Sequence, residues 1–227
     1  MKEKIDKTYL LLASIFIAAL VVCNLIANKF IYLDLTFLGL KEFKISAGVL
    51  PYPITFLITD LLSEIYGKKK TSQVVYTGFV ASIFVLFVLW LGNQFPAIEG
   101  SLIDDEEYAK MFGNSWRVVF ASMSAFLAAQ LLDVKVYHFW KDLTKGKHLW
   151  LRNNGSTIIS QLVDTTLVVG VLFIGVKPMG DLYEMIVDGW QFKILCALID
   201  TPLIYLFVWL LRKRFNLKEG EELYHSD

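Results

Sequence analysis

The stretch from Ser72 to Phe95 reads SQVVYTGFVASIFVLFVLWLGNQF. It is the most uniformly apolar part of the chain, and it contains no charged residue. A helix needs about 20 apolar residues to cross the hydrocarbon core of a bilayer, where the backbone must satisfy its own hydrogen bonds. The stretch therefore predicts a transmembrane helix.

Five further apolar segments flank this stretch, and each is long enough to cross a bilayer with some tilt. Hydrophobic residues make up 56% of the 227-residue chain, whereas a soluble chain would show amphipathic patterns with frequent polar positions. The sequence predicts an all-α integral membrane protein in which about six transmembrane helices form one bundle, a single domain over residues 1–227. The predicted helices cover residues 8–28, 46–66, 72–95, 115–140, 154–176 and 190–211.

Lysine and arginine gather in every second connection between these segments. The opposite loops are poor in positive charge, and one carries the acidic run Asp104–Glu107, which we interpret as a solvated outer loop. Because cytoplasmic loops are enriched in Lys and Arg, we expect a multi-pass protein with both termini in the cytoplasm. The basic groups lie at Lys2–Lys7, Lys68–Lys70, Lys141–Arg152 and Arg212–Lys218.

The composition excludes several other kinds of partner and site. The chain has 22 Lys and Arg against 22 Asp and Glu, so no net positive charge attracts nucleic acid. Cys23 and Cys196 lie within apolar segments, and the three histidines are scattered. Because no metal-ligand spacing is visible, we expect no metal and no cofactor.

Residues 29–44 break the helical pattern between the first two segments. Ile31 and Leu33 alternate with Tyr32 and Asp34, and this period of two is typical of a β-strand. We expect a short hairpin or an interfacial flap outside the bundle.

Polar side chains inside the predicted helices form the candidate site, because ionisable residues in hydrocarbon are costly and are usually functional. A rise of 1.5 Å per residue places Asp164 roughly 15 Å and Asp200 roughly 18 Å from the cytoplasmic side, near the midplane. Within single helices the candidates recur at spacings of three or four residues, which place them on one face. They are Asn24 and Asn28, Asp60 and Glu64, Gln130 and Asp133, and Gln161 and Asp164.

Carboxylates accept hydrogen bonds, whereas carboxamides both donate and accept them. Such a set suits a neutral, planar heterocycle with a donor-rich edge, for example a guanine-like edge held by one carboxylate in bidentate fashion. Tyr52, Phe56, Tyr76 and Trp116 are candidates to stack on its ring. In the alternative interpretation, the acids pair with basic residues and only hold helices together. The candidate basic partners are Arg117, Lys135, Arg152 and Lys193.

Two stretches of the sequence resemble motifs of a known family. The stretch PITFLITDLLSEIYGK over Pro53–Lys68 resembles the signature of the queuosine precursor transporters, also called the vitamin uptake transporter family. The stretch RNNGST over Arg152–Thr157, followed by Ser160, Gln161 and Asp164, is similar to a second family motif. Gln130 and Asp133 also fit, as do Asn24 and Asn28. The matches span roughly residues 20–205.

The resemblance implies uptake of queuosine precursors across a prokaryotic cytoplasmic (inner) membrane, for salvage into tRNA modification. The expected ligands are 7-cyano-7-deazaguanine, 7-aminomethyl-7-deazaguanine or queuine, and the resemblance adds Asn153 to the candidate site. The implied architecture is similar to the substrate-binding subunits of energy-coupling-factor transporters. The expected partners are the small deazaguanine and the lipid bilayer, with a homo-oligomer left open and no nucleic acid.

Two other classes of function stay open at this point. The first is a substrate-capture subunit that needs an ATPase partner, since the chain has no phosphate-binding Gly-rich loop of its own. The second is a membrane enzyme that uses paired carboxylates as acid and base. No histidine cluster or nucleophile–base pair supports the second, so we expect a protein that is not an enzyme.

Overall fold

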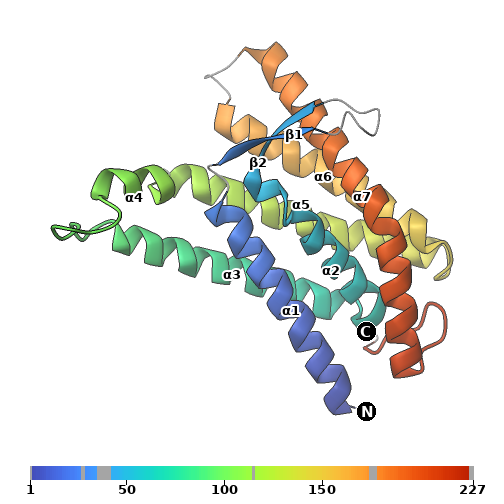
Figure 1. Cartoon of the computed structure of the whole chain (residues 1–227). Coiled ribbons are helices and arrows are strands. Elements are labelled where there is room, and N and C mark those ends of the chain that lie inside the picture. The colour runs from blue at the N-terminus through green and yellow to red at the C-terminus, as the bar shows by residue number, and fades with distance from the viewer. Residues whose placement is uncertain (1, 27–28, 35–41, 114–115, 174–177, 225–227) are drawn as a thin grey trace.

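The computed structural model describes residues 2–26, 29–34, 42–113, 116–173 and 178–224 (Figure 1). Its long helices are α1 (Lys2–Leu25), α2 (Tyr52–Tyr66), α3 (Lys68–Gly92), α5 (Trp116–Leu143), α6 (Leu149–Phe173) and α7 (Met179–Phe215). The shorter elements are β1 (Phe30–Asp34), β2 (Glu42–Ser46), the 3₁₀ turn η2 (Ala47–Val49) and α4 (Asp105–Phe112).

The long helices coincide with the predicted segments, which confirms the all-α membrane fold. Among the described residues, four spans are long and apolar enough to cross a membrane, namely α1, η2 with α2, α3 and α7. The 28 residues of α5 and the 25 of α6 also suffice in length. An arrangement of six spans in one domain stays a prediction.

The helix α7 is longer than the sequence predicts, because it begins at Met179 rather than near residue 190. Asp181, Glu184 and Asp188 interrupt the apolar pattern over its first turns. Hydropathy alone could therefore not extend the helix to its true start.

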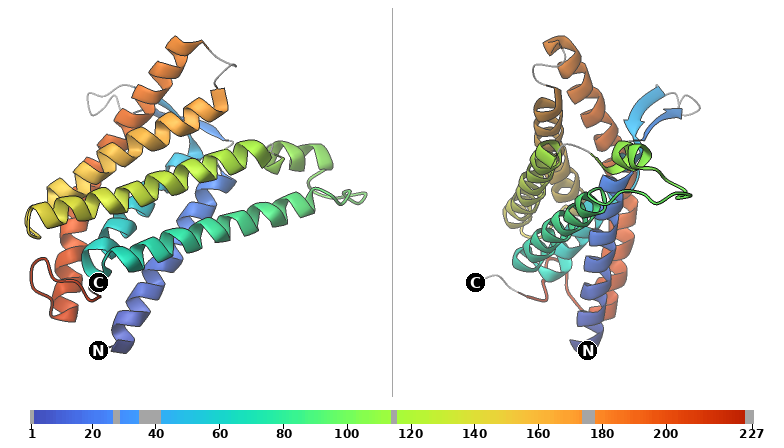
Figure 2. Two further views of the ribbon diagram at one scale, coloured as in Figure 1. Left: turned by 180° about the vertical axis from the view of Figure 1, so that it is seen from behind. Right: turned by 90° about the vertical axis from the view of Figure 1, so that its left-hand side faces the viewer.

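The helix α2 lies in the middle of the bundle and contacts α1, α3, α5 and α7. Figure 2 shows α5 and α6 running side by side, and α3 packs against both α5 and α1. The side chains of Leu62 and Ile65 are fully buried in the core against Phe16 of α1 and Ile204 of α7. The central position of α2 buries its polar residues along with its apolar ones.

The outer helices expose apolar side chains that a soluble protein would bury. Examples are Leu10 on α1, Phe84 and Phe87 on α3, and Leu206 on α7. Extended apolar surface of this kind marks a contact with lipid or with another protein. It agrees with the apolar composition of these helices, and lipid is the partner expected for them.

A two-stranded antiparallel hairpin confirms the ordered non-helical structure predicted after the first helix. β1 pairs with β2 from Phe30 opposite Ser46 to Asp34 opposite Glu42, and residues 35–41 of the predicted segment lie outside the described residues. Ile45 packs on Phe192 of α7. The hairpin therefore lies against α7 and leads directly into η2 and α2.

The basic connections meet at one end of the bundle, near the two chain ends marked in Figure 1. Tyr66 at the end of α2 donates a hydrogen bond to Ile5 O, 3.0 Å away, and Leu223 N donates to Ile65 O over 2.8 Å. Gly146, between α5 and α6, packs against Gly220. This end of the bundle therefore contains the start of α1, the α2–α3 junction, the α5–α6 loop and the C-terminal segment Leu217–Tyr224.

The acidic run lies in an exposed helix rather than in a loop. Asp104 caps α4 by accepting a hydrogen bond from Glu107 N at 2.7 Å, and the Glu107 side chain accepts one from Asp104 N. Reciprocal bonds of this kind start a helix efficiently. The run was predicted to be solvated, and that part of the prediction holds, because α4 buries none of its residues.

Candidate functional site

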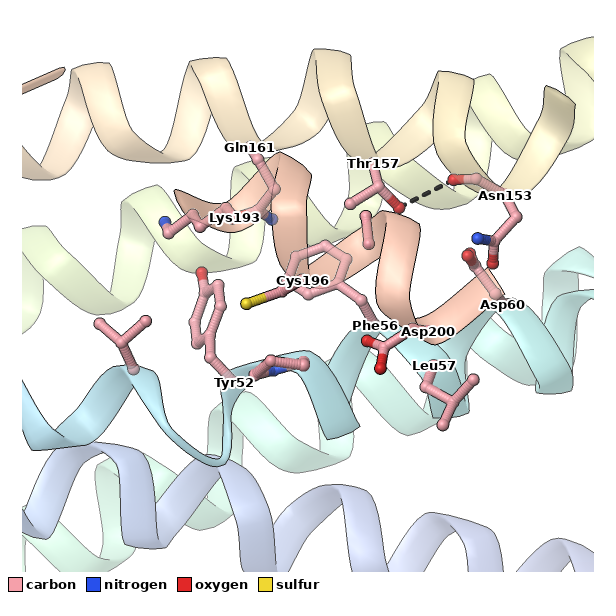
Figure 3. Close-up of a pocket in the computed structure, with 13 residues that line it drawn as sticks. Tyr52, Phe56, Leu57, Asp60, Asn153, Thr157, Gln161, Lys193, Cys196 and Asp200 are labelled. Atoms are coloured by element: carbon pink, nitrogen blue, oxygen red, sulfur yellow. Dashed lines mark hydrogen bonds between the residues drawn. The ribbon is translucent and has the colours of Figure 1, made fainter. Parts of the chain in front are cut away.

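A pocket lies between the first turns of α2 and the facing turns of α6 and α7 (Figure 3). Three of the predicted site residues, Asp60, Asn153 and Gln161, line it together. The full lining is Val49, Tyr52, Pro53, Phe56, Leu57, Asp60, Asn153, Thr157, Gln161, Lys193, Cys196, Ala197 and Asp200.

The local sequence explains why α2 begins beside this pocket. Ser46 ends the hairpin and caps η2 by accepting a hydrogen bond from Gly48 N at 3.1 Å. Pro51 then precedes α2, and Pro53 lies in its first turn. Backbone N–H groups in the first turn have no acceptor within the helix, so proline costs no hydrogen bond there. The helix therefore starts inside the bundle, with Tyr52 and Phe56 facing α6 and α7.

One end of the pocket is formed by Asp60 and Asn153. The Asp60 side chain is almost fully buried, and its Oδ1 atom has no hydrogen-bond partner within the described part of the chain. Figure 3 shows its carboxyl group beside the Asn153 carboxamide, while Thr157 donates to the Asn153 backbone oxygen over 2.8 Å. A buried carboxylate oxygen without a donor costs about 1–3 kcal/mol, so this end is suited to a ligand that donates hydrogen bonds.

The other end of the pocket is formed by Tyr52, Lys193 and Gln161. Asp164 lies behind it and accepts hydrogen bonds from Tyr52 Oη at 2.8 Å and from Lys193 Nζ at 2.6 Å. The Lys193 ammonium also lies 4.7 Å from the centre of the Tyr52 ring, within cation–π range. Asp164 therefore holds two pocket residues in place rather than lining the pocket itself.

Aromatic rings form one wall between the two ends. The Tyr52 and Phe56 rings have centroids 5.3 Å apart and are inclined at 50°, and the Phe126 ring meets Tyr52 edge-on at 6.1 Å. Cys196 and Ala197 of α7 also line the pocket. A flat ligand would find an aromatic wall with polar groups at both ends. Of the other predicted stacking residues, Tyr76 is exposed on α3, and the side chain of Trp116 lies outside the described residues.

A second polar layer lies behind Asp60, on α5 and α6. Asp133 is fully buried and accepts a hydrogen bond from Ser160 Oγ at 2.9 Å. Gln130 is also fully buried, and neither of its amide atoms has a partner in the described ranges. These two predicted residues are near the pocket but do not line it.

Glu64 lies outside the pocket, although it is only one helical turn beyond Asp60. Arg152 binds its carboxylate in bidentate fashion, from Nε to Oε2 at 2.9 Å and from Nη2 to Oε1 at 2.7 Å. Arg212 bonds the same carboxylate, and Tyr137 donates to it over 2.9 Å. For Glu64, and for Asp164 with Lys193, the geometry therefore matches the alternative of acids paired with bases.

The remaining predicted residues are not brought to this pocket. Asn24 donates to Leu20 O at 3.1 Å and to Met123 Sδ at 3.4 Å, next to α3 and α5. Asn28 lies outside the described residues.

The predicted site set did not include two charged pocket residues, Lys193 and Asp200. Both had a usable signal, since each is an ionisable residue within an apolar helix. Within the described ranges, no group of three or more His, Cys, Asp or Glu residues could hold a metal ion. The arrangement can bind a polar planar ligand, and it holds no nucleophile beside a histidine base.

Comparison with known proteins places this geometry in a family. The profile described as "Putative vitamin uptake transporter" matches residues 46–207, which include every residue that lines the pocket. A protein of Bacillus subtilis (strain 168) named "Probable queuosine precursor transporter" is 34% identical over 160 residues, covering 70% of this chain and 69% of that protein.

A protein of Haemophilus influenzae Rd with the same name is 28% identical over 149 residues, covering 63% of this chain and 59% of that protein. No solved structure matches the chain significantly. Since the profile covers well over half of its length, the chain belongs to the vitamin uptake transporter family.

Proposed function

We propose that this protein takes up queuosine precursors across a prokaryotic cytoplasmic membrane, and that the pocket between α2, α6 and α7 binds their 7-deazaguanine ring. The names of its relatives support this substrate class. The observation that carries the proposal is the buried Asp60 carboxylate, whose Oδ1 lacks a donor among the described residues and lies beside the Asn153 carboxamide.

Recognition would use the donor-rich edge of the ring. The two Asp60 oxygens can accept the adjacent ring N–H and exocyclic amine, and Asn153 can donate to the neighbouring ring carbonyl. An added hydrogen bond contributes about 0.5–1.5 kcal/mol, and satisfying a buried polar atom also removes its desolvation penalty of about 1–3 kcal/mol. The Phe56 and Tyr52 rings would contact the face of the heterocycle, and Gln161 and Lys193 would lie toward its far side.

The proposed topology follows from the end of the bundle at which the basic residues meet. The positive-inside rule assigns that end to the cytoplasm, so both termini are cytoplasmic and the hairpin lies on the outer side. Asp60 and Asp200 would then be reached from outside by way of the α2 start, next to Val49 and Tyr52.

Calorimetric titration of the purified protein tests the proposed site. The cyano- and aminomethyl-deazaguanines and queuine are compared with guanine, for wild type, Asp60→Asn and the exposed control Asp181→Asn. We expect selective binding of a deazaguanine, a Kd raised about 10- to 100-fold in Asp60→Asn, and no change in Asp181→Asn. Absence of binding by a folded sample, or unchanged affinity in Asp60→Asn, would contradict the proposed site.

A further inference from the structure

A second cavity lies at the basic end of the bundle, on the outer side of α6 and α7. It encloses about 1290 Å³ of unfilled space that is partly open to the surroundings. The first turn of α6 forms one wall and the last turns of α7 form the other. Its main lining residues are Trp150, Arg152, Tyr205, Trp209, Arg212 and Lys213. We name this cavity the α6–α7 groove.

The groove carries an excess of positive charge. Arg152 is fully engaged, since it bonds Glu64 and also donates to Gly146 O at 3.0 Å and Lys147 O at 2.8 Å. Arg212 uses Nη2 on Glu64, but its buried Nε has no acceptor in the described part of the chain. Lys213 is exposed, with its ammonium 5.1 Å from the Trp209 ring. Lys213 is therefore the exposed cation of the groove, Arg212 adds a positive charge that it shares with Glu64, and Glu219 is the one acidic residue of the lining.

Aromatic side chains surround these cations. Trp150 is 52% exposed, Trp209 57% and Tyr205 45%, and the Tyr205 hydroxyl accepts a hydrogen bond from Trp150 N at 3.1 Å. Tryptophan and tyrosine are enriched where a membrane protein crosses from hydrocarbon to headgroups. Along α7, the exposed side chains of Leu206 and Leu210 continue from the groove as an apolar surface.

We propose that the α6–α7 groove binds the headgroup of an anionic phospholipid. The phosphate would lie between Arg212 and Lys213, and the acyl chains would follow the exposed apolar face of α7. Basic pockets between transmembrane helices at the cytoplasmic side bind anionic headgroups in this way. A lipid can bury its acyl chains against the exposed leucines of α7, whereas a free phosphate cannot. The apolar surface therefore favours a lipid. The proposal does not depend on which substrate the pocket takes.

The test uses native mass spectrometry of the full chain released from nanodiscs made of equal parts phosphatidylglycerol and phosphatidylcholine. The variant Lys213→Ala removes a groove charge that makes no ion pair with a described residue, so the fold should survive. Lys69→Ala is the matched control, because Lys69 is an exposed lysine at the same end of the bundle but outside the groove. Inorganic phosphate is added in a separate arm.

We expect wild type and Lys69→Ala to retain phosphatidylglycerol in preference to phosphatidylcholine. Retention should be about fivefold weaker in Lys213→Ala, the effect of roughly one basic residue near an anionic surface. Equal retention of the two lipids, or an equal loss in both variants, would overturn the proposal. Displacement of the lipid by inorganic phosphate would assign the groove to a free anion instead. A dimer that Lys213→Ala abolishes would assign it to a second copy of the chain.

Discussion

At the residue scale, the pocket is marked by polar atoms that the protein itself leaves unsatisfied. Asp60 Oδ1 and both amide atoms of Gln161 are buried without partners within the described ranges. Each such group costs about 1–3 kcal/mol, so a site that keeps several of them is poised for a ligand that supplies donors and acceptors. The three ionisable neighbours Lys193, Asp164 and Asp200 set the electrostatics around that ligand.

Asp164→Asn is expected to abolish uptake while leaving the protein folded. Asp164 holds the Lys193 ammonium at 2.6 Å and the Tyr52 hydroxyl at 2.8 Å, and each bond to its charge contributes about 1.5–3 kcal/mol. Without that charge, Lys193 and Tyr52 lose the positions they take in the pocket. The measurement is deazaguanine uptake by cells, with gel filtration of the purified variant to check its fold. Unchanged uptake would remove Asp164 from the mechanism.

Glu64→Gln is expected to destabilise the protein rather than to alter ligand selectivity. The substitution leaves the buried Arg152 and the partly buried Arg212 without their shared carboxylate, and breaking a buried pair in this way costs about 3–5 kcal/mol. Thermal unfolding in detergent measures the loss. The control Glu106→Gln removes an exposed pair with Lys110, which is expected to matter little. A stable Glu64→Gln protein that no longer binds deazaguanine would place Glu64 in the site after all.

The pocket contains three of the predicted site residues, Asp60, Asn153 and Gln161, and two of the predicted stacking residues, Tyr52 and Phe56. The other predicted residues lie outside it for a clear physical reason. The four-residue spacing correctly placed Asp60 and Glu64 on one face of α2. It could not show that Arg152, 88 residues away in the chain, would reach Glu64 and not Asp60. Ionisable residues in apolar helices can be found from sequence, but their pairing depends on contacts between helices that spacing within one helix does not determine.

At the element scale, the C-terminal segment Leu217–Tyr224 closes the basic end of the bundle. Lys141 joins it to the helices, with Nζ 2.9 Å from Glu222 Oε1 and 3.1 Å from Glu64 O. The Tyr224 ring stacks on Tyr66 with centroids 6.5 Å apart. The segment thus ties α2, α5 and α7 together beneath the buried Glu64 cluster.

Glu222→Gln is expected to lower the free energy of unfolding by about 1–3 kcal/mol, because Lys141 is almost fully buried and would lose its second carboxylate. The matched control is Glu219→Gln, since Glu219 is an exposed glutamate in the same segment. Urea unfolding in mild detergent compares the two. Equal stability of both variants would show that the segment does not hold the helices together.

Regular sequence patterns predicted the type of each element more accurately than its first and last residues. The period of two over Ile31–Asp34 correctly indicated a strand, and uniform apolarity indicated α3. A hairpin was predicted, but the bounds of β2 and the start of α7 were not, because neither has a distinctive pattern of its own. β2 is defined by its pairing with β1, and the first turns of α7 are too polar for hydropathy to detect.

At the scale of the whole molecule, four separate basic segments meet at one end, and the exposed acidic helix α4 follows the far end of α3. We predict that cysteine labelling with a membrane-impermeant maleimide will reveal this asymmetry. In a background with Cys23 and Cys196 replaced by alanine, Ser101→Cys should react in intact cells and Lys69→Cys only after lysis. Labelling of Lys69→Cys in intact cells would reverse the proposed orientation.

We propose that this chain alone moves a queuosine precursor through the α2–α6–α7 pocket. The most direct measurement is uptake of a radiolabelled deazaguanine into liposomes that contain only the purified protein, compared with empty liposomes and with Asp60→Asn. We expect the wild-type protein to show saturable uptake and the Asp60→Asn variant to show none. Binding without uptake by wild type would instead indicate a capture subunit that needs an ATPase partner, and equal uptake by Asp60→Asn would contradict the pocket as the transport site.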